Sequence, residues 1–284
     1  MVKQFPSVKT LGYYRKMKLD GCCALITGAS AGIGREFARQ LAGRAGTIVL
    51  VARREERLRE LRDELTKRDP NLKILLRKTD LANSVELEEL MAGLEREKID
   101  IDLLINNAGV GDLGHFATID PERLEQILFV NMVALTVLTR RLLPAMFSRK
   151  RGAILNVSSS AGFLPIAGFA VYAATKSYVT AFSEALRAEV RGKGLSVCAL
   201  CPGPVNTEFM QIAQRPGKQP YMAAPEFVHV SAEDIARAGL AAVEADRPLA
   251  IPGLFMKLAM FFVRLTPMSI LRLASRMTAK RDRN

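Results

Sequence analysis

The 284-residue sequence has few of the residues on which disulfide-built and metal-binding domains depend. It contains four cysteines, two histidines and no tryptophan. Four cysteines are too few for a disulfide framework in a chain of this length. Cys198 and Cys201 have CxxC spacing, but they lie in an apolar run typical of a buried strand rather than of a redox helix. His115 and His229 stand alone, without neighbouring ligand residues. We therefore expect core cysteines, no metal ion and a reducing, intracellular compartment.

Long apolar runs are also missing. A secretory signal needs an apolar core of roughly 7–15 residues near the N-terminus, and residues 1–20 contain none. Leu254–Leu265 has ten apolar residues in twelve, whereas a helix that spans a bilayer needs about 20. The sequence therefore predicts a cytoplasmic protein, which at most touches the inner face of a membrane peripherally.

Positive charge exceeds negative charge, and the excess is concentrated at the two ends of the chain. The formal net charge is +12, of which residues 1–20 carry +4 and residues 250–284 carry +6. The long middle part is therefore nearly neutral, which excludes a surface-wide nucleic-acid footprint. Two interpretations of the basic ends stay open: attraction to an anionic surface such as lipid, and solvated termini that keep the protein soluble.

Short apolar runs alternate with amphipathic stretches of helical period, which are expected at Glu55–Lys67, Val85–Glu97, Pro121–Phe147 and Tyr172–Arg191. Such alternation builds βαβ units. We therefore predict an α/β fold, namely a three-layer, doubly wound Rossmann fold with a seven-stranded parallel sheet. The predicted strands are Cys22–Thr27, Thr47–Val51, Lys73–Leu76, Ile101–Ile105, Ala153–Val157, Ser196–Leu200 and Leu249–Ile251.

Two regions interrupt this alternation. Residues 208–229 contain three prolines and a glycine without a clear period, which is typical of a substrate lid inserted into an α/β domain. After Gly253, the apolar stretch carries basic residues at helical spacing. We divide the chain into an N-terminal basic extension (1–17), one Rossmann domain (18–253) that includes the lid insert (208–229), and an amphipathic basic C-terminal segment (254–284).

A glycine-rich turn, Thr27–Gly34 (TGASAGIG), joins the first predicted strand to a helix. Its glycines permit a tight turn and let the backbone approach a pyrophosphate at the positive helix N-terminus. The second strand runs into Arg53 and Arg54 where NAD sites place an acid, and an arginine there accommodates a 2′-phosphate instead. The pattern favours NADP(H) over NAD(H), with plain surface charge as the alternative for both arginines.

Tyr172 and Lys176 are four residues apart, which places a phenol and an ammonium on one face of a helix. A nearby ammonium lowers the pKa of tyrosine, which is otherwise about 10. Ser159 lies thirteen residues before the tyrosine, just after a predicted strand, at the sheet edge where open α/β proteins bind ligands. Ser158 and Ser160 are its competitors for a catalytic role.

In these motifs the sequence resembles the short-chain dehydrogenase/reductase family over about residues 18–251. The resemblance implies an enzyme that interconverts a ketone and a secondary alcohol with NADP(H). One departure is Ala31, where some members carry a basic residue that helps to select NADP. The matching motifs are Thr27–Gly34, Asp80-Leu81, Asn106-Asn107-Ala108-Gly109, Asn131, Ser159, Tyr172 with Lys176, and Pro202–Thr207 (PGPVNT).

The resemblance also implies a role for each site residue. Tyr172 would be the general acid or base, and Ser159 would orient the carbonyl oxygen. Lys176 would lower the pKa of Tyr172 and bind the nicotinamide ribose, and Asn131 would hold a water that relays protons. A homodimer or homotetramer is expected by analogy alone. The cofactor would be bound by Gly28, Ser30, Gly32, Ile33, Gly34, Arg53, Arg54, Asp80, Leu81, Asn107, Ala108, Gly109, Tyr172, Lys176, Pro202, Gly203, Val205 and Thr207.

Apolar residues near these motifs favour a hydrophobic ketone, such as an acyl-chain or lipid-like carbonyl, although ordinary packing is the alternative for each of them. A dehydrogenase of small hydroxy acids is a second hypothesis; it would need a carboxylate-binding residue, for which the insert offers Arg215 and Lys218. A non-catalytic dinucleotide-binding protein is a third. The expected pocket residues are Val110, Phe163, Leu164, Phe169, Phe209, Met210 and Met222.

Three interpretations of Leu254–Leu265 stay open. Lys257 and Arg264 are seven residues apart and so share a helical face, which suits a helix lying in a membrane interface. The same apolar stretch also suits a subunit interface or a flap over the active site.

Overall fold

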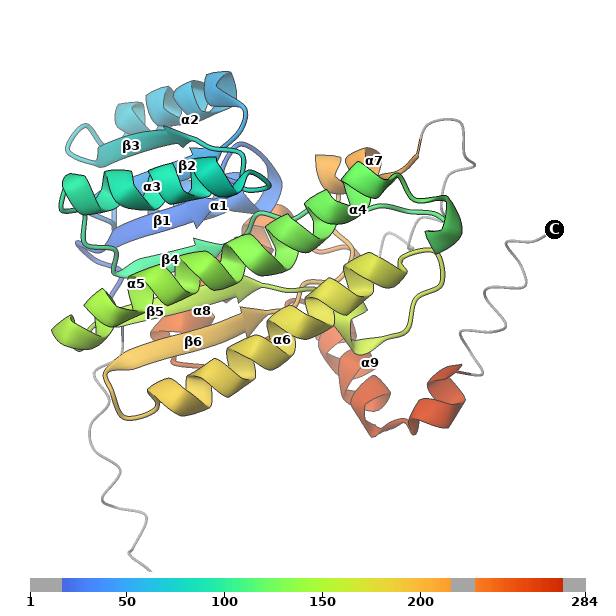
Figure 1. Ribbon diagram of the computed structural model, residues 1–284. Coiled ribbons are helices and arrows are strands. Elements are labelled where there is room, and N and C mark those ends of the chain that lie inside the picture. The colour runs from blue at the N-terminus through green and yellow to red at the C-terminus, as the bar shows by residue number, and fades with distance from the viewer. Residues whose placement is uncertain (1–16, 216–227, 273–284) are drawn as a thin grey trace, which may run out of the picture.

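The computed structural model describes residues 17–215 and 228–272. In this part of the chain, seven parallel strands form one sheet in the order β3-β2-β1-β4-β5-β6-β7, with helices on both faces (Figure 1). The predicted three-layer, doubly wound fold is confirmed. The strands are β1 (Cys23–Thr27), β2 (Thr47–Ala52), β3 (Lys73–Lys78), β4 (Leu103–Asn106), β5 (Gly152–Val157), β6 (Leu195–Leu200) and β7 (Leu249–Ala250).

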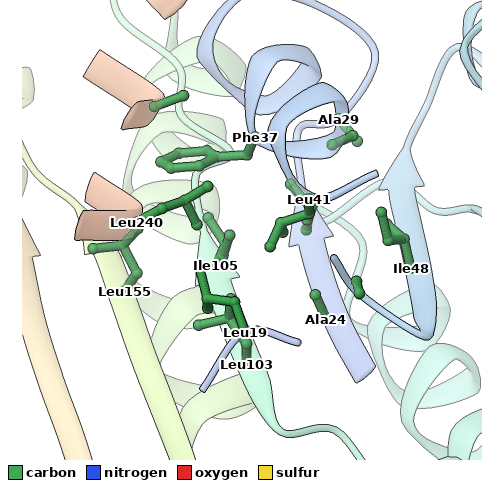
Figure 2. Close-up of a cluster of buried hydrophobic side chains, with 14 of the residues drawn as sticks. Leu19, Ala24, Ala29, Phe37, Leu41, Ile48, Leu103, Ile105, Leu155 and Leu240 are labelled. Atoms are coloured by element: carbon green, nitrogen blue, oxygen red, sulfur yellow. The ribbon is translucent and has the colours of Figure 1, made fainter. Parts of the chain in front are cut away.

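The central strands are apolar throughout because helices bury both of their faces. Along β1, Ala24 and Ile26 point into one hydrophobic core and Leu25 points into the other. Figure 2 shows how Phe37 of the first helix packs over the strands in the first of these cores. The helices over that face are α1 (Gly32–Leu41), α2 (Glu55–Arg68) and α8 (Ala232–Glu244); those over the other are α3 (Ser84–Arg96), α4 (Pro121–Leu128), α5 (Leu135–Arg149) and α6 (Ala170–Val190).

The leucine periodicity of the predicted helices is confirmed in α2, where Leu58, Leu61 and Leu65 are buried on one stripe. Helix α3 begins where its sequence offers a cap, because the Asn83 side chain accepts hydrogen bonds from the first-turn backbone N–H groups. Such a cap satisfies donors that the helix itself cannot pair. Local sequence therefore sets both the position and the buried face of these two helices.

The prediction of one continuous helix over Pro121–Phe147 is wrong in one respect. A π-helical turn at Phe129–Ala134 separates α4 from α5. Single π turns are frequent at functional sites, because they re-aim a side chain within a helix. The combined element, Pro121–Arg149, is the one helix among the described residues that is long and apolar enough to cross a membrane. Its apolar window is 44% buried, as expected of a helix that packs on a sheet.

Other element boundaries differ slightly from the predictions. Strand β4 starts at Leu103, two residues after Ile101, and β3 continues two residues past Leu76 to Lys78. The insert, predicted to be irregular, begins with a short helix, α7 (Glu208–Ala213). Residues 216–227 of the insert lie outside the described part. The apolar C-terminal stretch forms helix α9 (Leu254–Leu265).

The four cysteines are free thiols, as predicted for core residues. Cys22 belongs to one core and Cys23 packs against the other, so the two neighbours do point to opposite faces of the sheet. Burial raises the pKa of Cys198 to about 12 and that of Cys201 to about 11. Thiols with such pKa values are poor nucleophiles at neutral pH.

Candidate active site

The glycine-rich turn brings three backbone segments into contact at the carboxyl edge of β1. Gly28 and Gly32 have positive φ angles of 66° and 52°, which favour glycine. A methyl group on Gly34 would lie 2.3 Å from the backbone oxygen of Gly28, and one on Gly28 would lie 2.9 Å from the Cα atom of Ala108. Side chains at these positions would force the segments apart, so the predicted turn residues do form one compact floor.

Hydrogen bonds fix the loop after β4 to this floor. The hydroxyl of Thr27 accepts hydrogen bonds from the backbone N–H groups of Asn107 (2.9 Å) and Ala108 (3.0 Å). The Asn107 amide donates in return to the backbone oxygen of Thr27 at 2.9 Å. The predicted residues Asn107, Ala108 and Gly109 therefore lie beside the glycine turn, where the sequence placed them.

The loop after β6 closes the same site from the other side. The Thr207 side chain lies 3.2 Å from the position that a methyl group on Gly32 would take. Its hydroxyl also accepts a hydrogen bond from the backbone N–H of Phe209 and so caps α7. Pro202 accepts a backbone hydrogen bond from Ser160 at 2.8 Å, and Val205 packs against the first core. The predicted Pro202–Thr207 motif thus touches both the glycine turn and the serine segment.

The two arginines after β2 differ in their surroundings. Arg53 is 54% exposed, and its nearest acid is Asp80, at 3.8 Å. Arg54 donates to the Glu208 carboxylate at 2.8 Å and to the Ser30 hydroxyl at 3.4 Å. Arg53 is therefore better placed than Arg54 to meet an added anion. The sequence did not predict that Glu208, the first residue of α7, would pair with Arg54.

Tyr172 and Lys176 lie one turn apart on α6, and both are buried, at 8% and 4% exposure. The Lys176 ammonium is 5.6 Å from the centre of the tyrosine ring and donates to the backbone oxygen of Val157 at 2.8 Å. The Ser159 hydroxyl lies close enough to the phenol to lower its pKa. Ser158 is engaged elsewhere, because its hydroxyl donates to the backbone oxygen of Lys176 at 2.7 Å. The geometry therefore favours Ser159 over Ser158.

The electrostatics of this pair differ from the expectation. The sequence predicted that Lys176 would lower the pKa of Tyr172. Burial instead raises the pKa of Tyr172 to about 12, and it outweighs the opposite, smaller effect of Ser159. Burial also lowers the pKa of Lys176 to about 8. Desolvation is the largest cause for both groups, because burial disfavours the charged form of each. At neutral pH the phenol is therefore protonated and the lysine is still largely an ammonium.

Asn131 sits in the π turn and is 1% exposed. Its side-chain oxygen accepts from the Val110 backbone N–H at 2.8 Å, and its amide donates to the Val110 oxygen at 2.9 Å and to the Thr175 hydroxyl at 3.0 Å. A methyl group on Gly109 would lie 3.7 Å from Asn131 and 3.4 Å from Lys176. Asn131 therefore ties the loop after β4 to α6. Sequence reasoning gave no role to Thr175, which lies between Tyr172 and Lys176 in the catalytic motif.

An aromatic cluster surrounds the phenol. The ring of Phe169 stacks on Tyr172 with centroids 4.3 Å apart, and the ring of Phe209 from α7 lies 5.2 Å away. Both were expected pocket residues. Leu113 and Ala213 belong to the same cluster and were missed, because contacts between distant loops leave no local pattern in a sequence.

The other expected pocket residues fall elsewhere. Phe163 and Leu164 line a neighbouring cavity of about 440 Å³ that also touches Met268. Val110 packs against the second core. Met210 is 37% exposed, and Met222 lies outside the described residues. The expected set of seven therefore does not form one pocket: Phe169 and Phe209 surround the phenol, and Phe163 and Leu164 line the neighbouring cavity.

Ionic contacts hold α7 over the site. Arg215 forms a largely buried ion pair with Asp112, and its guanidinium also donates to the Thr118 hydroxyl at 2.7 Å. Arg123 donates to the backbone oxygens of Gly111 (2.7 Å) and Ile212 (3.1 Å). Arg215, which the hydroxy-acid hypothesis needs as a carboxylate ligand, is thus already paired. The other candidate, Lys218, lies outside the described residues.

Comparisons with known proteins agree with this geometry. A family model described as short chain dehydrogenase matches residues 22–217. The chain is 38% identical over 192 residues, 66% of this chain and 75% of the other, to an NADP-dependent 3-hydroxy acid dehydrogenase of Salmonella typhi.

Two solved structures are similar in fold and sequence. A short-chain dehydrogenase from Sphingobium yanoikuyae in complex with NADPH superposes with a TM-score of 0.74 at 32% identity, over 82% of this chain and 88% of that one. A bulky-bulky ketone specific alcohol dehydrogenase from Comamonas testosteroni superposes with a TM-score of 0.72 at 30% identity, over 82% and 86%.

Proposed function

The chain belongs to the short-chain dehydrogenase family, and we propose that this member reduces an apolar ketone to a secondary alcohol, or reverses that reaction, with NADP(H). It is an oxidoreductase that acts on CH–OH groups, and it prefers NADP(H) to NAD(H). The observation that carries the proposal is the buried phenol of Tyr172, which lies close to Ser159 and packs against the rings of Phe169 and Phe209.

The residues at the carboxyl edge of the sheet fit a dinucleotide. The first turn of α1 presents backbone N–H groups, because Ala31 at its N-cap offers no side-chain acceptor, and such a helix end binds a pyrophosphate. Arg53 supplies an exposed cation at the edge where a 2′-phosphate is bound. Asp80 and Leu81 would flank the adenine. The other expected cofactor residues would contact the rest of the dinucleotide, between the adenine and Tyr172.

Bound NADPH would supply a hydride to the carbonyl carbon. The protein's part is to bind, orient and protonate. Ser159 would donate a hydrogen bond to the carbonyl oxygen, and Tyr172, which is protonated at neutral pH, would give that oxygen its proton. The Lys176 ammonium, one turn away, would stabilise the phenolate that is left. Asn131 would act as a positioning residue, since it joins the loop after β4 to α6.

The apolar cluster around Tyr172 favours a hydrophobic carbonyl over a small hydroxy acid. A carboxylate substrate needs a free cationic partner, and Arg215 is paired with Asp112. The name of the Comamonas relative, specific for bulky ketones, supports the proposal. The name of the Salmonella relative supports the hydroxy-acid alternative. A non-catalytic role is disfavoured because Asn131, Ser159, Tyr172 and Lys176 are all present and gathered together.

The test is NADPH consumption by the purified protein with ketones and 3-oxoacyl thioesters of graded chain length, with NADH in parallel. Each buried methylene contributes about 0.8 kcal/mol, so kcat/KM should climb up to about fourfold per added carbon while the pocket has room. Activity that is flat with length, or highest on short 3-hydroxy acids, would overturn the substrate proposal and leave the oxidoreductase assignment intact.

We also propose a cytoplasmic homo-oligomer. The free cysteines agree with a reducing compartment, and a dimer or tetramer is the expectation by analogy with the family. Light scattering on the purified protein gives its mass directly; a monomer at micromolar concentration would contradict the proposal.

A further inference from the structure

Helix α9 presents an apolar surface on the side that faces away from the protein. It is anchored by Met256 and Met260, one turn apart and both buried. The Met256 side chain lies against Gly203, in the loop after β6. In Figure 1, α9 is drawn in red at the lower right, at one end of the molecule and clear of the sheet. The helix is therefore anchored along the stripe of these two methionines, whereas most of its other large side chains are exposed.

The solvent-facing side of α9 is not polar, as it would be in an ordinary surface helix. Five large side chains project from it, with exposed fractions between 51% and 75%. Four of them follow one line along the helix, at spacings of four, three and four residues, and one phenylalanine lies beside that line. These residues are Leu254, Leu258, Phe261 and Leu265, flanked by Phe262. A continuous apolar face of this kind marks a binding surface.

Basic residues border this face. Lys257 and Arg264 are seven residues apart and exposed on a third side, between the anchored stripe and the apolar line. Arg264 also lies 5.8 Å above the ring of Phe163, which holds its charge near the body of the protein. Residues 250–284 contain seven basic residues and one acid. The occupant of the apolar face must therefore be apolar where it meets the leucines and anionic where it meets the basic border.

We propose that α9 docks this protein on the surface of an anionic phospholipid bilayer. The apolar face would enter the boundary of the acyl chains, with the helix lying in the membrane plane. Lys257 and Arg264 would then reach phosphate headgroups, and the basic chain that follows would add attraction to the surface. The helix has 12 residues, too few to span a bilayer, so the attachment is peripheral.

A second copy of the chain suits this surface less well. A two-fold interface places the same patch of each subunit against its mate. Two segments with a net charge of +6 each would then face one another, and like charges in contact oppose association. An anionic bilayer offers negative headgroups to the basic residues and an apolar interior to the leucines and phenylalanines. This argument does not depend on the reaction proposed for Tyr172.

The test is flotation of the full-length protein with extruded vesicles. Vesicles of phosphatidylglycerol and phosphatidylcholine in equal parts should bind it at least about tenfold more tightly than phosphatidylcholine alone, and 0.5 M NaCl should weaken the binding strongly. Phe262→Ser should reduce binding at least about tenfold. Val85→Ser is the matched control, because Val85 is 63% exposed on α3 and Phe262 is 64% exposed on α9; it should bind as the wild type does.

A double variant, Lys257→Gln with Arg264→Gln, should lose most of the preference for anionic vesicles and keep the wild-type melting temperature. Failure of the wild type to float with anionic vesicles, or equal flotation of Phe262→Ser, would overturn the proposal. A light-scattering mass that falls to the monomer in Phe262→Ser, with no vesicle binding by the wild type, would assign the face to a second copy instead.

Discussion

Arg53 gives the sharpest test of cofactor selection, because its neighbour Arg54 provides a built-in control. Arg53 is half exposed, with its nearest acid 3.8 Å away, whereas Arg54 already donates to Glu208 at 2.8 Å. A hydrogen bond to a charged group contributes roughly 1.5–3 kcal/mol, and exposure to solvent favours the lower end of that range. Arg53→Ala should therefore lower kcat/KM for NADPH about 10- to 30-fold and leave kcat/KM for NADH unchanged within about twofold.

The assay is steady-state reduction of one ketone with each cofactor, by the wild type and three variants. Arg54→Ala should cost about threefold or less with NADPH, because its guanidinium is shared with Glu208. Arg59→Ala, equally exposed on α2 and paired with Glu55, should change nothing. Equal losses with NADPH and NADH would mean that Arg53 supports the fold rather than the 2′-phosphate. An Arg54 effect larger than the Arg53 effect would mean that Arg54, and not Arg53, is the main partner of the 2′-phosphate.

Three further predictions test separate parts of the account. Gly34→Ala should abolish NADPH binding in a fluorescence titration, since the added methyl group would lie 2.3 Å from the backbone oxygen of Gly28. Gly93→Ala is the contrasting variant: its methyl group has room in the helix, so it should raise the free energy of unfolding by about 0.5–1 kcal/mol. Burial lowers the pKa of Lys176 from 10.5 to about 8. Between pH 8 and 10.5 the lysine therefore carries a proton in the unfolded chain but not in the folded protein, and the free energy of unfolding should rise with pH. Urea denaturation should show a steeper rise across this range for the wild type than for Lys176→Met. Asp112→Asn should release Arg215 from its ion pair and raise kcat/KM for a 3-hydroxy acid about tenfold relative to that for an apolar ketone, because a freed guanidinium can pair with the substrate carboxylate.

Each of these predictions has a contradicting result. Normal NADPH affinity in Gly34→Ala would mean that the turn can open without loss of the site. Parallel pH profiles for the wild type and Lys176→Met would mean that Lys176 is not desolvated in the folded protein. An unchanged substrate ratio in Asp112→Asn would mean that Arg215 does not face the substrate.

Much of the fold could be predicted from local patterns. The leucines of α2 and the apolar strands report burial directly, because each element must turn an apolar face to the sheet. The π turn at Phe129–Ala134 could not be predicted, because its cause is the tertiary contact of Asn131 with Val110 and Thr175. Helix α7, at the start of the 208–229 insert, was missed for another reason, since its six residues are too few to show a helical period.

The candidate site was predictable where function demands particular residue types at fixed spacing. The glycine turn, the Tyr172–Lys176 pair and the loops after β4 and β6 all meet at the same edge of the sheet. The pKa of Tyr172 was not predictable in direction, since the sequence shows the neighbouring charge but not the depth of burial. The pairing of Arg215 with Asp112 also spans 103 residues and leaves no local signal.

The most direct test of the central claim is the variant Tyr172→Phe, measured for turnover and for NADPH binding. The variant keeps the aromatic ring that stacks on Phe169 and removes the proton donor. Turnover should fall by at least about 100-fold, the contribution of a positioned general acid, while the Kd for NADPH stays within about threefold of the wild-type value. Turnover within tenfold of the wild type would contradict the account, because the proton would then reach the carbonyl oxygen from another group.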